Sequence, residues 1–92
     1  MMRMRNIRYA DTFIEGVAGI YSNAVLATLD KRLEAIESFP ELGSPDVRPS
    51  LIERHGNGIR KLPVPPFVIM HRYDKQTDTL DFLALPYEKT IE

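Results

Sequence analysis

The sequence predicts an α+β fold, in which an N-terminal strand, a two-helix hairpin and a three-stranded antiparallel meander form one sheet with the helices on one face. Two observations lead to this prediction. Residues 12–39 place apolar side chains at helical spacing, and residues 59–85 contain short apolar runs separated by turn residues. Helices and antiparallel strands that are segregated along a chain are typical of this layered class.

The first strand and the first helix are expected at the start of the chain. Arg5–Tyr9 alternates polar and apolar residues, as a short strand does. Either Asp11 or Thr12 can then cap a helix, and Thr12 and Glu15 fit a capping box. Gly16 and Gly19 weaken this helix by roughly 1 kcal/mol each relative to Ala. Alternatively, these small residues allow another backbone to approach closely.

A second helix is the clearest of the predicted elements. Ser22 offers a break and a fresh N-cap, and Pro40 ends the helix because proline has no backbone N–H to donate. The apolar stripe between them steps by three and four residues and is predicted to be core: Leu26, Leu29, Leu33 and Ile36. With a short connection, the two helices are expected to form an antiparallel hairpin.

The second half of the chain predicts strands after an irregular segment. Residues 40–57 are rich in Pro, Gly, Ser and Asp, with a turn of helix expected near Pro49–Arg54. The three strands expected after that segment are Ile59–Val64, Phe67–Tyr73 and Leu80–Leu85. Pro63 cannot donate to a ladder, which favours a strand end or a sheet edge for its strand.

The composition bounds the class of protein. The 92 residues allow one domain, predicted to span residues 1–92, and 43% hydrophobic residues suffice for a core. The absence of cysteine from the sequence excludes disulfides and thiolate metal sites. No apolar run approaches the roughly 20 residues that span a bilayer, and no apolar signal core follows the basic start at residues 1–5. We therefore expect a cytoplasmic protein without a membrane partner.

The charges are balanced in number but not in position. Twelve Lys and Arg against thirteen Asp and Glu give a net charge of −1, unlike the strongly basic balance of a nucleic-acid-binding domain. Residues 48–61 are nevertheless mostly cationic, and residues 74–92 are mostly acidic. The cationic segment fits either a local binding surface or an ordinary solvated loop.

The order of these segments resembles the RelE/ParE superfamily of toxins from bacterial type II toxin–antitoxin systems. The resemblance rests on a helix that ends in Phe39–Gly43, followed by strands at Ile59–Val64, Pro66–Tyr73 and Leu80–Leu85. The Pro-x-x-Gly after the long helix, followed by a strand carrying Arg, is more similar to the ParE-like (plasmid stabilisation) branch than to the RelE branch. The resemblance covers nearly the whole chain and implies the RelE/ParE-like fold.

This resemblance also implies partners and a function. Such toxins are neutralised by a small cognate antitoxin, whose C-terminal segment wraps the toxin. ParE-like members inhibit DNA gyrase and are not nucleases, whereas RelE-like members cut messenger RNA on the ribosome. We expect a growth-inhibiting toxin that acts on gyrase without being an enzyme. The alternatives are a RelE-type endoribonuclease and a non-toxic interaction module, and either a homodimer or a toxin–antitoxin hetero-oligomer is compatible with the sequence.

The expected catalytic residues, if the chain were RelE-like, are Arg60, His71 and Tyr87. RNA cleavage of this kind needs a base for the ribose 2′-hydroxyl, a proton donor for the 5′-oxygen and cations around the phosphorane. Near Tyr87 there is little positive charge, and Asp81 and Glu88 would repel phosphate. A ribosome-dependent nuclease is therefore not favoured. Each of the three residues also fits a structural role: an ion-paired strand residue, a buried histidine and an aromatic cover for the sheet edge.

The cationic and aromatic residues of the second half are the expected target- or partner-binding residues: Arg54, Arg60, Lys61, Arg72 and Tyr87. In a regular strand, Lys61 points to the face opposite Arg60, so the two would not act on one atom. Two histidines without clustered ligand spacing argue against a metal site, and no phosphate-binding loop is present. No metal and no cofactor are expected.

Overall fold

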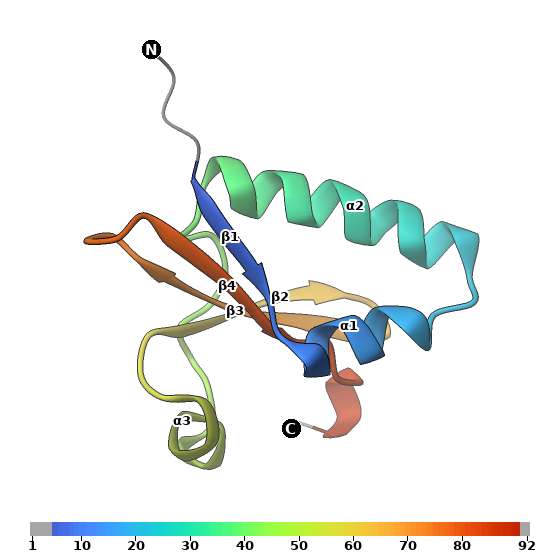
Figure 1. The fold of residues 1–92 in the computed structure, drawn as a ribbon. Coiled ribbons are helices and arrows are strands. Elements are labelled where there is room, and N and C mark those ends of the chain that lie inside the picture. The colour runs from blue at the N-terminus through green and yellow to red at the C-terminus, as the bar shows by residue number, and fades with distance from the viewer. Residues whose placement is uncertain (1–4, 91–92) are drawn as a thin grey trace.

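The computed structural model describes residues 5–90, and the basic stretch at residues 1–4 lies outside them. The elements follow the predicted order, including a short helix in the connection after the second long helix, and one unpredicted 3-10 turn follows the last strand (Figure 1). The strands are β1 (Asn6–Tyr9), β2 (Ile59–Val64), β3 (Phe67–Asp74) and β4 (Thr79–Ala84). The helices are α1 (Asp11–Ala18), α2 (Asn23–Ser38), α3 (Pro49–His55) and a 3-10 turn, η1 (Glu88–Thr90).

The four strands form one sheet in the order β1-β4-β3-β2. β2, β3 and β4 are the predicted antiparallel meander, and β1 pairs in parallel with β4, with Ile7 opposite Leu80. β2 lies at the edge, where Pro63 is tolerated because an edge strand has one unpaired side. Ser44 covers part of that edge, since its N–H and C=O bond to the backbone of Lys61 at 2.9 Å each.

The hairpin of α1 and α2 packs on one face of the sheet, as predicted, and this face holds the larger core (Figure 1). Phe82 and Ile69 at the centre of the sheet are fully buried there, against Ile36 of α2 and Phe13 of α1. The predicted close approach occurs at Gly16. A Cβ at this position would lie 2.9 Å from the Cβ of Leu85, so a side chain would push α1 away from the end of β4.

The shorter helix α3 lies on the opposite face of the sheet (Figure 1). Its predicted location near Pro49 is confirmed, and Pro49 occupies the start of the helix, where a missing N–H costs nothing. A small second core forms beneath it from Val47, Ile59 and Met70. The sheet is therefore covered on both faces, by layers of unequal size.

One of the two predicted helix caps is confirmed and the other is wrong. Ser22 accepts a hydrogen bond from the backbone N–H of Val25 and caps α2. The capping box at Thr12 does not form, because α1 begins at Asp11 and has no side-chain cap. Instead, the hydroxyl of Thr12 donates to the carbonyl of Leu83 and ties α1 to the end of β4.

Candidate partner-binding site

An open apolar groove of about 440 Å³ lies between α1 and α2. The residues that line it are Tyr9, Phe13, Ile14, Val17, Ala18, Leu26, Leu29, Asp30 and Leu33. Ile14 is 53% exposed and Tyr9 is 47% exposed, whereas Phe13 and Leu29 at the bottom are buried. Asp30 is the single charged residue of the lining. This surface has the apolar chemistry of a docking site for another chain.

The groove explains why the predicted stripe of α2 is only partly core. Leu29 and Ile36 are buried as expected, but Leu26 and Leu33 are half-buried and form one wall of the groove. Helical spacing alone does not separate these two pairs, because all four residues lie within one broad apolar face. The prediction of a continuous core stripe is therefore corrected for the two leucines that face α1.

Arg60 and His71 are directly opposite each other in the ladder between β2 and β3. Both hold the segment that follows α2. The guanidinium of Arg60 donates to the carbonyl of Gly43 at 3.2 Å, and Nε2 of His71 lies 2.8 Å from the carbonyl oxygen of Leu42. A carbonyl can only accept, so Nε2 carries the hydrogen and Nδ1 is the unprotonated nitrogen. These contacts give both side chains a structural role.

His71 is fully buried, and this burial lowers its pKa to about 4. The hydrogen bond to Leu42 acts in the opposite direction but is outweighed, and the nearby charge of Arg60 lowers the pKa further. The ring is therefore neutral at pH 7. Among the described residues Nδ1 has no hydrogen-bond partner, and it is closed off from solvent. A general base needs contact with its substrate, which this nitrogen lacks.

Tyr87 lies beside Phe67, at the start of β3, whereas His71 lies in the middle of this strand. The ring of Tyr87 is 4.7 Å from that of Phe67, and the two residues form an isolated β-bridge. Phe67 and His71 are four residues apart on one strand, roughly 13 Å at about 3.3 Å per residue. The structure thus brings Arg60 and His71 together and leaves Tyr87 far from both. The ring of Tyr87 remains 56% exposed and accessible to a partner.

Arg72 and Arg54 lie on the α3 side of the sheet. Arg72 donates to the carbonyl of His55 at the end of α3 (2.7 Å), and its other nitrogen lies 3.7 Å from Asp81. Asp81 also accepts hydrogen bonds from Nε and Nη2 of Arg8, and these guanidinium hydrogen bonds hold the pKa of its carboxyl below the usual value. Arg54 lies in the last turn of α3. Arg72 is therefore largely engaged in holding α3 to the sheet.

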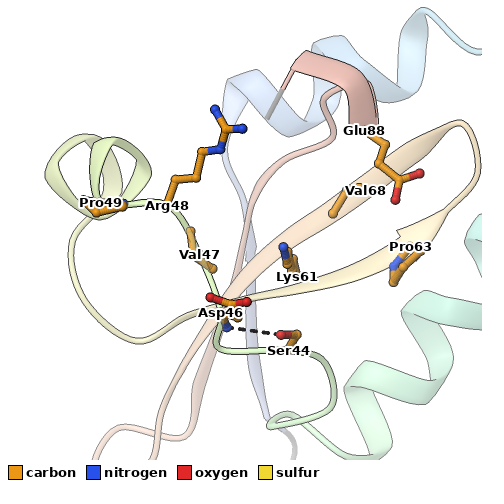
Figure 2. Close-up of a pocket in the computed structure, with 9 residues that line it drawn as sticks. All are labelled: Ser44, Asp46, Val47, Arg48, Pro49, Lys61, Pro63, Val68 and Glu88. Atoms are coloured by element: carbon orange, nitrogen blue, oxygen red, sulfur yellow. Dashed lines mark hydrogen bonds between the residues drawn. The ribbon is translucent and has the colours of Figure 1, made fainter. Parts of the chain in front are cut away.

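Lys61 lines a second hollow, of about 450 Å³, on the α3 side of the sheet (Figure 2). Figure 2 shows its side chain between those of Asp46 and Arg48 on one side and that of Glu88 on the other, with Val68 on the neighbouring strand. As predicted for a regular strand, Lys61 and Arg60 serve different faces. The hollow mixes both signs of charge, so it does not select one class of ligand.

Within the described residues, 5–90, no cluster of three or more His, Asp or Glu side chains is arranged to hold a metal ion. The same part of the chain contains no helix that is both long and apolar enough to cross a membrane.

The fold and the open groove define a small α+β protein with an apolar surface suited to binding another chain. A family model described as the ParE toxin of type II toxin–antitoxin system, parDE, matches residues 7–90. Because this match spans most of the sequence, the chain belongs to the ParE toxin family and is the toxin component of a type II toxin–antitoxin system.

A solved structure shares the fold across nearly the full length. It is the toxin–antitoxin complex RelBE2 from Mycobacterium tuberculosis, with a TM-score of 0.67 and 13% sequence identity. The similarity covers 96% of this chain and 95% of that one. At this identity the comparison concerns the fold alone. No curated protein matches the sequence.

Proposed function

We propose that this toxin arrests growth by inhibiting DNA gyrase and that it is not a nuclease. The proposal follows the resemblance to ParE-like members and the family match over residues 7–90. The observation that carries it is the separation of the residues that a RelE-type reaction would need. Arg60 and His71 are engaged with the segment after α2, and Tyr87 lies beside Phe67, four residues from His71 along β3. General acid–base catalysis requires such groups within hydrogen-bond reach of one bond.

The test of this proposal uses the purified chain and purified gyrase. Supercoiling of relaxed plasmid should stop and cleaved DNA should accumulate, whereas messenger RNA in a translating extract should stay intact. Cleavage of messenger RNA at toxic doses, abolished by His71→Gln, would instead support the RelE-type endoribonuclease. Normal supercoiling at toxic doses would contradict the gyrase proposal.

We further propose that a cognate antitoxin binds in the groove between α1 and α2. The support is the exposure of Ile14 and Tyr9, which a partner would cover, in a chain whose relative of known structure is a toxin–antitoxin complex. Burying apolar surface of this kind is the main source of affinity in helix-in-groove recognition. The complex would be a hetero-oligomer of toxin and antitoxin in the cytoplasm. The toxin would contribute its single domain, residues 1–92.

The genetic test of the antitoxin proposal is direct. Expression of the chain alone should arrest growth, and co-expression of the short reading frame beside its gene should restore it. Unimpaired growth on expression alone would favour the third possibility, a non-toxic interaction module of the same fold.

A further inference from the structure

The groove between α1 and α2 is bordered by negative charge. Asp30 lines it, and Glu34 and Glu37 follow at four and seven residues, on the same side of α2. Asp11 stands at the start of α1, whose sequence contains no Lys or Arg. We refer to Asp30, Glu34, Glu37 and Asp11 as the acidic rim.

The charge of the rim reaches the groove lining. Tyr9, one of the lining residues, has its phenol pKa raised by burial first and by the negative charge of Glu37 second. The influence of Glu37 on this ring shows that the rim is close enough to act on a group in the groove.

Within the described residues, the neighbouring cations form no ion pair with this rim, and these cations include Lys31 and Arg32, which follow Asp30 on α2. Arg5 bonds to the carboxylate of Asp78, and its second donor meets the backbone carbonyl of Glu37 rather than the side chain. Arg8 is held by Asp81 on the other face of the sheet. Within residues 5–90, no ion pair involves any of the four rim carboxylates.

The stability of α2 does not account for the rim. Acidic side chains near the C-terminal end of a helix oppose the helix dipole, and like charges at a spacing of four residues repel each other. α2 carries both features, with Asp30 and Glu34 four residues apart and no basic residue in its last turn. Charge that weakens its own helix and borders a docking groove indicates a complementary partner.

We infer that the groove selects a cationic amphipathic helix of the antitoxin, with aliphatic side chains in the groove flanked by Lys or Arg against the acidic rim. This inference rests on the proposed binding of an antitoxin in the groove. α1, with eight residues, is about 12 Å long at roughly 1.5 Å per residue, so two turns of a partner helix fill the groove. The negative charge of the rim also repels an anionic membrane surface, so a cationic helix is a better fit to the groove than a lipid bilayer.

The experiment compares two synthetic helical peptides, each of roughly 15 residues, that share one leucine stripe. One carries Lys at all flanking positions and the other carries Glu. Binding to the purified chain is measured by fluorescence anisotropy at about 0.01 M and about 1 M salt, where the Debye length is about 30 Å and 3 Å. At low salt the Lys peptide should bind at least about tenfold more tightly, and high salt should remove the difference.

Two charge-matched variants locate the effect. Asp30→Asn, Glu34→Gln and Glu37→Gln together should abolish the preference for the Lys peptide. The control triple variant removes the same charge from the α3 side, by Asp46→Asn, Glu53→Gln and Glu88→Gln, and should keep the preference.

Equal binding of the two peptides, absence of binding by both, or an unchanged preference in the groove variant would overturn the inference. The proposed function fails separately, through absence of growth arrest or absence of rescue by the neighbouring gene.

Discussion

The two faces of the sheet use their apolar side chains differently. The hairpin face buries a larger core around Phe82 and still exposes the groove between α1 and α2. The α3 face has a small core around Met70. Beside this core, Asp81 forms ion pairs with Arg8 and Arg72. The exposed apolar surface therefore lies on the face that needs it least for stability. Such a surplus is what a partner-binding surface requires.

The largest expected effect on stability comes from truncating one buried side chain in each of the two cores. Phe82→Ala should lower the free energy of unfolding by about 4 kcal/mol, because it removes a fully buried ring from the larger core. Val47→Ala, in the smaller core, should cost about 1.5 kcal/mol for its two lost methyl groups. Urea denaturation followed by circular dichroism measures both. Equal losses would contradict the unequal layers.

Acid should act on the two faces in different pH ranges. His71 has a folded pKa of about 4 against an ordinary value of 6.5, so the unfolded chain binds more protons between these values. Stability should therefore fall by about 3 kcal/mol as the pH drops from 6.5 to 4. The carboxylate of Asp81, whose pKa is lowered, stabilises the fold above about 3.8, and this contribution is lost only at lower pH.

His71→Gln separates the two effects. The glutamine keeps an amide donor for the carbonyl of Leu42 but does not titrate, so the fall between pH 6.5 and 4 should flatten while the drop at lower pH stays. Urea unfolding at a series of pH values measures the slope. A variant with the wild-type slope would mean that other groups cause it.

The two glycines of the hairpin make a matched pair. Gly16→Ala should destabilise the fold by roughly 1–3 kcal/mol, because the added Cβ meets the Cβ of Leu85 at 2.9 Å and overpacks the contact between α1 and β4. At Gly19 the nearest atom to an added Cβ is 3.5 Å away, so Gly19→Ala should change stability by less than about 0.5 kcal/mol. Thermal unfolding measures both. Similar values for the pair would contradict the close approach at Gly16.

A smaller effect is expected at the helix caps. Ser22→Ala should cost about 1 kcal/mol, since it removes the acceptor for the N–H of Val25 at the start of α2. Ser50 lies in the first turn of α3, which has no side-chain cap, so Ser50→Ala should be neutral. Chemical denaturation of the two variants side by side makes the comparison. A neutral Ser22→Ala would mean that the packing of α2 against the sheet makes its cap dispensable.

Much of the fold could be predicted from the sequence because its signals are local. The stop at Pro40, the cap at Ser22 and the strand patterns each depend on neighbouring residues, and the structure has these elements within a residue or so of the predicted bounds. The Thr12 capping box does not form because α1 begins one residue earlier, at Asp11, and the Thr12 hydroxyl instead bonds to Leu83. The pairing of β1 with β4 joins residues more than seventy positions apart, which no local pattern encodes.

The candidate site was less predictable. Charge and chemical type point to residues of the second half, whereas the groove is formed mainly by aliphatic residues of the first half, whose spacing is also that of a core. Whether Leu33 faces the sheet or α1 depends on how far apart the helices lie, and periodicity does not fix that distance. The burial of His71 followed the common behaviour of a lone histidine on an apolar strand face.

The central claim is that the antitoxin binds in the groove between α1 and α2, and one measurement tests it directly. The affinity of the purified chain for the product of the neighbouring gene is compared among wild type, Ile14→Glu and Phe39→Glu. Both side chains are exposed, so both variants should fold. Only Ile14 lines the groove, so only its replacement should weaken binding. Ile14→Glu should still arrest growth yet lose at least about tenfold in affinity, while Phe39→Glu binds normally. Wild-type affinity in Ile14→Glu would contradict the account.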